Sequence, residues 1–583
     1  MSDERVVLGI NCAYHESAAA LLRGGELVFA VEEERLSRVK HAKPARVDNA
    51  DALPFAAIGE CLRAGGVSLG EVDAVGFSLE PGRRVALVGR DPYPLADPRG
   101  FGSAEGEALF DAGVRRSAEL LAEHAGVPGF GSRVRFLPHH LCHAASAYLG
   151  GPFSRAAVLV LDGIGEEATG WLGLGEEGAL TRLEELPYPH SIGLLWEQLA
   201  LYLGLGAYDA GKAMGLAACG DATRPAAALD RLFRVVDPDG RDETGPPYVV
   251  DAELARLRGD LSGFEALFGP RAAPNGGSPD EQPHLCDLAA AIQRRTEEAL
   301  LACARRLARR THASALCYAG GVALNCVANA RLEREGPFEA IYVPGPAHDA
   351  GTALGAALLL GGARPRPEPL SPLVGPDYDD ARLERALRGS TFLVEPLADP
   401  SARAAELVAA GEIVGWFHGR LELGPRALGS RSLLADPRRL DMRERLNRQV
   451  KHRELFRPFA ASCLEEALDA WFEVPVREGP GAEASRELML LAYPVRAERR
   501  AQIPAVVHRD GTCRIQTVDA LRQPAYHALL ARFFALTGVP LVLNTSFNDS
   551  EPIVCSPEDA LATFGRTEID ALVIGDRLVR RRP

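Results

Sequence analysis

Two histidines four residues apart, His139 and His143, are the first residues whose types and spacing could do chemistry. They lie in an alanine-rich run after a proline, which predicts a short helix, and side chains at this spacing share one helical face. A strand-like run at 156–161 follows and ends in Asp162, a carboxylate beside a glycine turn. Two imidazoles and a carboxylate suit a first-row metal with open positions, such as Fe(II), Mn(II) or Zn(II). The same spacing is also common in histidines that pack in a core.

Three glycine-rich stretches add backbone donors and a second carboxylate. Lys212 stands next to permissive glycines, and a Gly320-Gly321 turn lies between a predicted strand and a predicted helix. Asp349 begins an Ala/Gly-rich helix, and a helix start favours an ionised carboxylate. Free N–H groups at helix starts can hold phosphate, which makes these turns candidate nucleotide contacts. Taken singly, each turn is more often plain loop geometry.

A basic region near the carboxy terminus predicts phosphate binding. Between Trp416 and Arg457 there are eleven Lys or Arg against five Asp or Glu, inside a chain of net charge −14. Arginine forks bind phosphate oxygens in pairs, and glycines let the backbone approach an anion. A solvated helix face would explain the arginines in 443–448 equally well. It fits Arg426 badly, because Gly-Pro-Arg-Ala-Leu-Gly is a loop with apolar flanks.

Two further strands in this region end in polar groups. Residues 508–518 predict a turn that leads into a strand with Arg514, and 540–548 predict a buried strand that ends in Ser546 and Asn548. Strand ends are the usual place for ligand contacts in α/β folds.

The elements that position these residues predict an α/β fold in two domains. Runs at 6–11, 18–22 and 27–31 form a strand–turn–strand pattern, and a weak echo of it recurs at 156–174. This echo predicts a duplicated α/β core, and a nucleotide cleft between such halves is the actin-like arrangement. The proline-rich stretch 363–378 predicts a linker between domains 1–362 and 379–583. Helical insertions are expected in 222–284.

Composition narrows the class of protein. With 583 residues, 47% hydrophobic and 25% charged, the chain has the make-up of a globular protein of two to four domains. Its acidic balance argues against a nucleic-acid partner, which would need a basic face. The sequence shows no basic-then-apolar leader and no apolar run of about 18 residues, so we expect no signal peptide and no membrane span. Eleven scattered cysteines without a CxxC pair fit a reducing cytoplasm.

Nine stretches in one order resemble a known family. They are HHLCHAASAY, LDGIGE, GKAMGLA, AGGVALN, HDAGTALGAA, GPRALGSRS, KHRELFRPFA, DGTCRIQTV and LNTSFN. Together they resemble the O-carbamoyltransferases of the NodU/CmcH type, whose members include a tobramycin carbamoyltransferase. Each stretch is weak alone, but the set is specific and spans most of the chain.

The resemblance implies two active sites. A carboxy-terminal YrdC-like domain would use ATP, as its Mg(II) complex, and carbamoyl phosphate to make carbamoyl-adenylate. An amino-terminal, actin-like domain similar to TsaD would pass the carbamoyl group to a hydroxyl of a small molecule. The implied metal is Fe(II), and the catalytic residues are His15, which could take the hydroxyl proton, and Lys40.

The family's motifs carry over to this sequence residue by residue. The implied metal ligands are His139, His143, Asp162 and Asp349, with His140 facing elsewhere on the helix as a neighbour of the ligands. The implied nucleotide contacts of the transfer site are Gly163, Gly165, Lys212, Gly320, Gly321 and Asn325. The implied ATP and carbamoyl-phosphate contacts are Arg426, Lys451, Arg457, Arg514, Ser546 and Asn548. One departure is Glu16, where the family often has aspartate, which puts any role of that carboxylate in doubt.

Other interpretations remain at this point. One is an enzyme related to threonylcarbamoyl transfer onto tRNA, which the acidic balance disfavours. Another is a non-catalytic nucleotide-binding regulator, which motifs in both domains disfavour. Relatives carbamoylate aminoglycosides, cephalosporins, nodulation factors and polyketide sugars, so antibiotic biosynthesis is one expected setting. A homodimer is expected on base rates alone.

Overall fold

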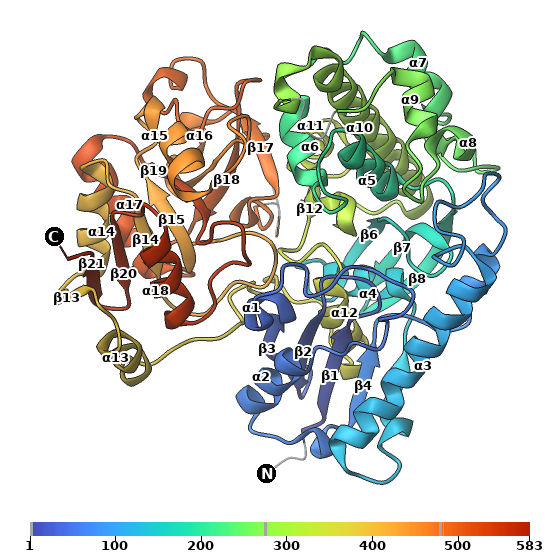
Figure 1. Ribbon diagram of the computed structural model, residues 1–583, viewed down its shortest axis with the longest axis horizontal. Coiled ribbons are helices and arrows are strands. Elements are labelled where there is room, and N and C mark those ends of the chain that lie inside the picture. The colour runs from blue at the N-terminus through green and yellow to red at the C-terminus, as the bar shows by residue number, and fades with distance from the viewer. Residues whose placement is uncertain (1–3, 273–276, 477–480, 482, 583) are drawn as a thin grey trace. The chain divides into compact units, whose positions relative to one another are not determined.

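A computed structural model describes residues 4–272, 277–476, 481 and 483–582 (Figure 1). The chain divides into two compact units. The first holds the chain up to 37, 41–370 and residue 481, and the second holds 38–40, 371–476 and the chain from 483 on. The change at 370 lies inside the stretch predicted as a linker. That residues 38–40 belong to the second unit was not predicted.

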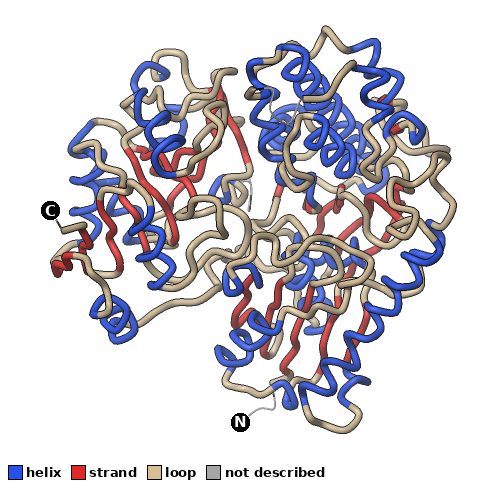
Figure 2. Tube along the Cα trace, viewed as in Figure 1, coloured by secondary structure: helices blue, strands red, loops and turns tan. Residues whose placement is uncertain are grey.

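The first unit contains two five-stranded sheets with the same pattern of strand directions. Figure 2 shows the strands in red and the helices in blue. One sheet consists of β1 (Val6–Asn11), β2 (Ala18–Arg23), β3 (Glu26–Glu32), β4 (Ala74–Phe77) and β5 (Val134–Phe136), and the other of β6 (Arg155–Leu161), β7 (Ala168–Glu176), β8 (Ala179–Pro187), β11 (Ala315–Ala319) and β12 (Ala340–Tyr342). The orders are β3-β2-β1-β4-β5 and β12-β11-β6-β7-β8. In each, the opening strand pairs antiparallel with the next strand and parallel with a later one.

Helices of the first unit cover these sheets. They are α1 (Glu33–Ser37), α2 (Phe55–Gly65), α3 (Ala104–Ala125), α4 (His139–Tyr148), α5 (Ile192–Tyr202), α6 (Ala210–Ala217), α10 (Pro283–Thr311), α11 (Cys326–Glu335) and α12 (Ala350–Gly361). The stretch 222–284 holds the expected helices α7 (Ala226–Leu232), α8 (Ala252–Ala255) and α9 (Ser262–Phe268), and also a strand pair, β9 (Phe233–Val235) with β10 (Tyr248–Val250).

Helix α12 packs against β1, β2 and α4, and small residues make this close approach possible. A Cβ at Gly9 of β1 would lie 1.9 Å from the Ala353 carbonyl oxygen of α12. A Cβ at Gly355 of α12 would lie 1.8 Å from the Cys142 carbonyl oxygen of α4. Because no side chain fits at either position, only glycine allows α12 to pack this closely against β1 and α4.

The second unit is built on one mixed nine-stranded sheet. Its strands are β13 (Leu393–Pro396), β14 (Val414–Phe417), β15 (Arg431–Ala435), β16 (Ala460–Leu464), β17 (Leu491–Pro494), β18 (Thr512–Val518), β19 (Leu541–Ser546), β20 (Ala571–Ile574) and β21 (Arg577–Arg580), in the order β13-β21-β20-β14-β15-β19-β16-β18-β17. Its helices are α13 (Asp380–Arg388), α14 (Pro400–Ala409), α15 (Leu440–Arg445), α16 (Leu468–Trp471), α17 (Pro524–Thr537) and α18 (Pro557–Arg566). The chain is therefore a mixed α/β protein, as the sequence predicts.

The apolar strands of both units form the buried core, and the central residues of β1, β6, β14 and β19 are fully buried. The predicted order of strand, Gly-Gly turn and helix is present. The turn leads first into a short 3-10 helix, Gly321–Leu324, and α11 begins at Cys326. Among the described residues, no helix is both long enough and apolar enough to cross a membrane.

Candidate metal centre and anion site

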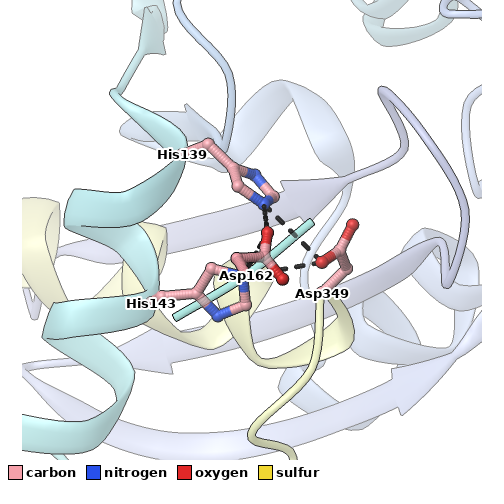
Figure 3. Close-up of side chains that lie close together, drawn as sticks. All are labelled: His139, His143, Asp162 and Asp349. Carbon is pink, nitrogen blue, oxygen red and sulfur yellow. Dashed lines mark ion pairs between the residues drawn. The ribbon is translucent and has the colours of Figure 1, made fainter. Parts of the chain in front are cut away.

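Four side chains predicted as metal ligands meet in one buried cluster (Figure 3). His139 and His143 project from α4, Asp162 follows β6, and Asp349 precedes α12. Their exposed fractions are 0%, 0%, 6% and 5%, and one nitrogen or oxygen of each lies within 4.8 Å of the others. We refer to these four residues as the carboxylate–imidazole cluster.

The distances within the cluster exceed hydrogen-bond length. His139 Nε2 lies 3.5 Å from Asp162 Oδ2 and 3.6 Å from Asp349 Oδ1. His143 Nε2 lies 3.5 Å from Asp349 Oδ1 and 3.8 Å from Asp162 Oδ2. Ligand atoms about 2.0–2.2 Å from a shared metal lie roughly 3 to 3.5 Å apart, so this spacing suits atoms arranged around an ion.

The ring of His139 is oriented by its other nitrogen. Its Nδ1 lies 3.0 Å from the Ser78 carbonyl oxygen, which can only accept, so Nδ1 donates this hydrogen bond and Nε2 faces the cluster. The backbone N–H of His139 also donates to Glu166 Oε1 at 2.9 Å. In the described chain, neither His139 Nε2 nor His143 Nε2 has a hydrogen-bond partner, although both are buried.

The Asp162 carboxylate is held by a close backbone approach. The N–H of Gly321 donates to its Oδ1 at 2.8 Å, which leaves Oδ2 directed at the histidines. The preceding Gly320 has φ +95°, and a Cβ there would lie 2.2 Å from the Leu161 carbonyl oxygen. This Gly-Gly turn therefore serves the geometry of Asp162, and a nucleotide contact by these glycines stays a prediction.

The charges of the cluster favour a cation. Burial alone would raise the pKa of Asp162, but the imidazoles hold it well below the usual range of that group. The pKa of Asp349 is lowered likewise, because His139 and His143 outweigh its burial. Two ionised carboxylates beside imidazole nitrogens that have no hydrogen-bond partner in the described chain fit a divalent metal. This set of nitrogen and oxygen donors is compatible with Fe(II), Mn(II) and Zn(II).

Two more side chains border this cluster. His140 directs Nε2 toward Asp162 Oδ2 at 3.7 Å, so it does not face away from the site, and it is a neighbour of a proposed ligand, as expected. Glu197 of α5 was not predicted. Burial, with the charges of Asp162 and Asp349, raises the pKa of Glu197 to about 8. The sequence did not indicate Glu197, because it lies far from most of the cluster residues along the chain and comes near them only in the folded structure.

The other residues predicted for the transfer site lie in varied settings. His15 packs edge-on against Tyr208, with ring centroids 4.7 Å apart. Lys212, on α6, pairs with Asp209 Oδ2 at 3.0 Å. Asn325 caps α11, accepting the Ala328 N–H at 3.1 Å, and its amide also donates to Gln293 at 2.8 Å. The roles predicted for these side chains stay predictions.

The remaining three predicted residues are two glycines and a lysine. Gly163 and Gly165 follow β6, and the Gly165 carbonyl accepts the Tyr14 hydroxyl. Lys40 is exposed and belongs to the second unit. Its predicted catalytic role, like the nucleotide contacts predicted for both glycines, stays a prediction.

The second unit holds a group of cations around one buried lysine, Lys451. Lys451 follows a π-helical turn, Leu446–Val450, a feature that is frequent at functional sites. Its Nζ donates to Asn548 Oδ1 at 2.7 Å, to the Asn548 carbonyl at 2.8 Å and to Ser546 Oγ at 3.2 Å. Three of the predicted phosphate contacts, Lys451, Ser546 and Asn548, therefore touch one another at the end of β19.

Like charges surround this lysine. Burial lowers the pKa of Lys451 well below its usual value, and Arg453 and Arg457 lower it further. The pKa of Arg453 is lowered in the same way by burial, Arg457 and Arg514. We refer to Lys451, Arg453, Arg457 and Arg514 as the cation cluster. Four cations held together against their mutual repulsion form a site that favours an anion.

Arg453 was missed as a site residue, although it stands between the two predicted ones, Lys451 and Arg457. It donates to Asn447 Oδ1 at 2.7 Å and lies 4.6 Å over the ring of Phe459. Arg426, which was predicted, lies in the loop between β14 and β15, and its contact with phosphate stays a prediction.

Comparison with known proteins shows what the chain is similar to. Residues 6–358 match the model of the carbamoyltransferase N-terminus, and residues 405–581 match that of the carbamoyltransferase C-terminus. The chain is 37% identical to nodulation protein NolNO of Sinorhizobium fredii, over 98% of this chain and 80% of that protein. It is 38% identical to an uncharacterized Synechocystis protein, over 97% and 95%. A nodulation protein U of Rhizobium fredii is 30% identical, over 94% and 90%.

Family models thus cover both units, the first with the carboxylate–imidazole cluster and the second with the cation cluster. The chain belongs to the carbamoyltransferase family.

Proposed function

We propose that this carbamoyltransferase works in two steps at two sites. The second unit converts ATP, carbamoyl phosphate and one water into carbamoyl-adenylate, phosphate and pyrophosphate. The first unit then passes the carbamoyl group to a hydroxyl of a small molecule. The product is a carbamate ester, and AMP is released. The cation cluster carries this proposal, because two phosphate-bearing substrates require several positive charges at one site.

The adenylation step requires two anions to react. ATP and carbamoyl phosphate repel each other, and cations that neutralise both lower the cost of bringing them together. Arginine forks such as those of Arg453, Arg457 and Arg514 suit phosphate oxygens. Lys451 contributes a point charge whose donors already engage Ser546 and Asn548. Arg426 and Mg(II), bound with ATP, belong to the same proposed site.

The transfer step is assigned to the carboxylate–imidazole cluster. His139, His143, Asp162 and Asp349 would hold the metal, with Fe(II) the proposed ion. When bound, the metal supplies Lewis acidity that polarises the carbamoyl carbonyl. The protein's own groups fix the ligands, because the Ser78 carbonyl orients His139 and the Gly321 N–H orients Asp162. The acceptor proton must still go to a base beside this centre.

The proposed architecture follows the same division. A duplicated actin-like, TsaD-like domain would span 1–362, a linker 363–378, and a YrdC-like domain 379–583. The repeated strand pattern of the two sheets in the first unit supports the duplication. The similarity to nodulation proteins supports a small-molecule acceptor, with a secondary-metabolite sugar or a polyketide antibiotic as the proposed class, and a cytoplasmic setting is proposed with it.

The test is pyrophosphate release from ATP, measured with and without carbamoyl phosphate and with no acceptor added. The proposal expects release that depends on carbamoyl phosphate. Release that is equally fast without carbamoyl phosphate would contradict the proposed donor. No release from a protein that binds ATP would contradict the adenylation step and favour a nucleotide-binding regulator.

A further inference from the structure

Glu16 and His41 form a carboxylate–imidazole pair that the proposed function has not yet used. Glu16 lies in the turn after β1, and His41 lies in the loop after α1. His41 Nδ1 is 2.6 Å from Glu16 Oε1. The backbone N–H of Glu16 also donates to the His41 carbonyl at 3.0 Å. Each residue therefore holds the other through both side chain and backbone.

Both residues occupy a backbone conformation that side chains rarely adopt. Glu16 has φ +51° and His41 has φ +62°. Strained non-glycine residues persist only where the surroundings over-determine them, and they concentrate at functional sites. Hydrogen bonds from neighbouring residues hold both backbones: Asn11 Nδ2 donates to the Glu16 carbonyl at 3.0 Å, and the His41 N–H donates to Glu34 Oε2 at 2.7 Å.

The pairing fixes the protonation pattern of the imidazole. Burial would raise the pKa of Glu16, but the bond from His41 and the charge of His348 lower it to about 2. Glu16 is therefore an ionised acceptor, so His41 Nδ1 donates the hydrogen bond and Nε2 is the ring nitrogen left for a substrate. No described residue bonds to His41 Nε2. The His41 side chain is 24% exposed, so the ring is not sealed in the core.

Tyr208 places the pair beside the transfer site. Its ring centroid is 5.0 Å from that of His41 and 4.7 Å from that of His15. On the other side of the pair, Glu16 Oε2 lies 3.8 Å from Nε2 of His348, the residue that precedes the proposed metal ligand Asp349. The two imidazoles thus flank one aromatic ring at the edge of the carboxylate–imidazole cluster.

Only one of these imidazoles has a carboxylate partner. The Nδ1 atom of His15 is buried and has no hydrogen-bond partner in the described chain. A carboxylate on Nδ1 orients an imidazole and stabilises the imidazolium that forms when it accepts a proton. His41 has this arrangement and His15 lacks it.

We propose that His41, held by Glu16, is the base that takes the proton of the acceptor hydroxyl. This inference rests on the proposed carbamoyl transfer. The acceptor oxygen forms a bond to the carbamoyl carbon, the carbon–oxygen bond to AMP breaks, and its electron pair leaves with AMP. The hydroxyl proton passes to His41 Nε2 and then to solvent. Glu16 is a positioning residue, and His15 contacts the substrate without taking its proton.

The experiment compares nucleophiles that need a base to different degrees. Full-length, metal-loaded protein is given ATP, carbamoyl phosphate and one of three probes: ethanol, trifluoroethanol or hydroxylamine. Carbamoylated product is counted above the rate without enzyme, and pyrophosphate release is followed in parallel. The variants are His41→Gln, His15→Gln and Glu16→Gln. His284→Gln, at an exposed position of α10, is the matched control.

If His41 is the base, His41→Gln lowers transfer to ethanol by about 100-fold or more. The loss is smaller with trifluoroethanol and smallest with hydroxylamine, because acidic or strongly nucleophilic probes need less help. Added imidazole restores transfer in His41→Ala, and Glu16→Gln shows the same order of losses at smaller size. His15→Gln lowers all three rates by one factor, and His284→Gln changes none.

Two other results would count against the assignment. Equal losses with all three probes in His41→Gln, without rescue by imidazole in His41→Ala, would overturn the base and leave carbamoyl transfer standing. Failure of the unmodified protein to carbamoylate any probe, despite pyrophosphate release dependent on carbamoyl phosphate, would overturn the proposed hydroxyl transfer and this inference with it. A metal content equal to that of the unmodified protein shows that the first unit of each variant has folded.

Discussion

The carboxylate–imidazole cluster and the cation cluster are suited to ligands of opposite charge. In the first unit, two carboxylates face two imidazoles at 3.5–3.8 Å, so opposite groups approach without bonding. In the second unit, Lys451, Arg453, Arg457 and Arg514 gather although they repel one another. The donor set of the first cluster suits a cation, and the gathered positive charges of the second suit an anion.

This difference shows how one chain can divide two chemical tasks. A cluster short of positive charge suits a metal that polarises a carbonyl, and a cluster short of negative charge suits phosphates. Each is held by its own backbone contact: the Gly321 N–H on Asp162, and the Asn548 carbonyl on Lys451. The tasks should therefore fail separately when either cluster is damaged.

The largest expected effect is on the carboxylate–imidazole cluster. His139→Ala removes a lone pair that no neighbouring group replaces, so metal content and carbamoyl transfer should fall by more than about 100-fold. Pyrophosphate release should be unchanged, because it depends on the other unit. Metal analysis of the purified variant and both activity assays check this prediction. Equal loss of both activities would contradict the separation of tasks.

His140→Ala is the matched control for that variant. His140 reaches the same carboxylate at 3.7 Å but is not one of the four clustered residues. We expect a metal loss of about 10-fold, the effect of removing a residue that supports a ligand. A loss as large as that of His139→Ala would make His140 a ligand and enlarge the cluster to five residues.

The second effect concerns the cation cluster. Arg514→Ala should lower pyrophosphate release by roughly 100-fold, because one pre-arranged charge on the reacting phosphates is lost. Transfer from supplied carbamoyl-adenylate should continue. Arg448→Ala is the control, since Arg448 is 64% exposed and pairs with Glu444 at 3.1 Å. If both variants lost release equally, general charge rather than the cluster would attract the substrates.

A third, smaller effect follows from the pKa of Lys451. Burial, Arg453 and Arg457 hold that pKa well below its usual value, so Lys451 loses its proton at a lower pH than an exposed lysine would. An anion binds best to the protonated form. Affinity for inorganic pyrophosphate should therefore fall as the pH rises through this lowered pKa, by up to about tenfold per pH unit. Titration calorimetry across the pH range measures it.

Lys451→Met separates this lysine from other titrating groups. Without Lys451 the affinity should be weaker at low pH and should lose most of its pH dependence. A variant that kept the full slope would assign the titration to another residue, such as His508, whose pKa is also lowered by burial.

How much of these clusters the sequence predicts depends on how far each contact reaches along the chain. His139 and His143 were predicted because helical periodicity alone aligns them. Asp162 and Ser546 were predicted because strand ends are positions where α/β folds expose polar groups. The contacts at Gly321–Asp162 and Glu16–His41 cross 159 and 25 residues, and only the fold brings those residues together.

The expectations for His140 and Glu16 differed from the structure for a similar physical reason. Periodicity gives the direction of His140 on α4 but not the position of Asp162, which comes to meet it. Glu16 was doubted for its extra methylene, yet its Oε1 lies at bonding distance from His41 because both backbones have positive φ. Such conformations leave little trace in sequence when the residue is not glycine.

The smallest expected effect tests whether the first unit also recognises a nucleotide. Asn325 was predicted as a nucleotide contact, but its side chain caps α11 and bonds to Gln293. Asn325→Ala should lower the free energy of unfolding by about 1 kcal/mol, the cost of a lost cap, which chemical denaturation measures. The KM for supplied carbamoyl-adenylate should not change. A raised KM with unchanged stability would assign Asn325 to the nucleotide after all, and the first unit would then hold an anion as well as a cation.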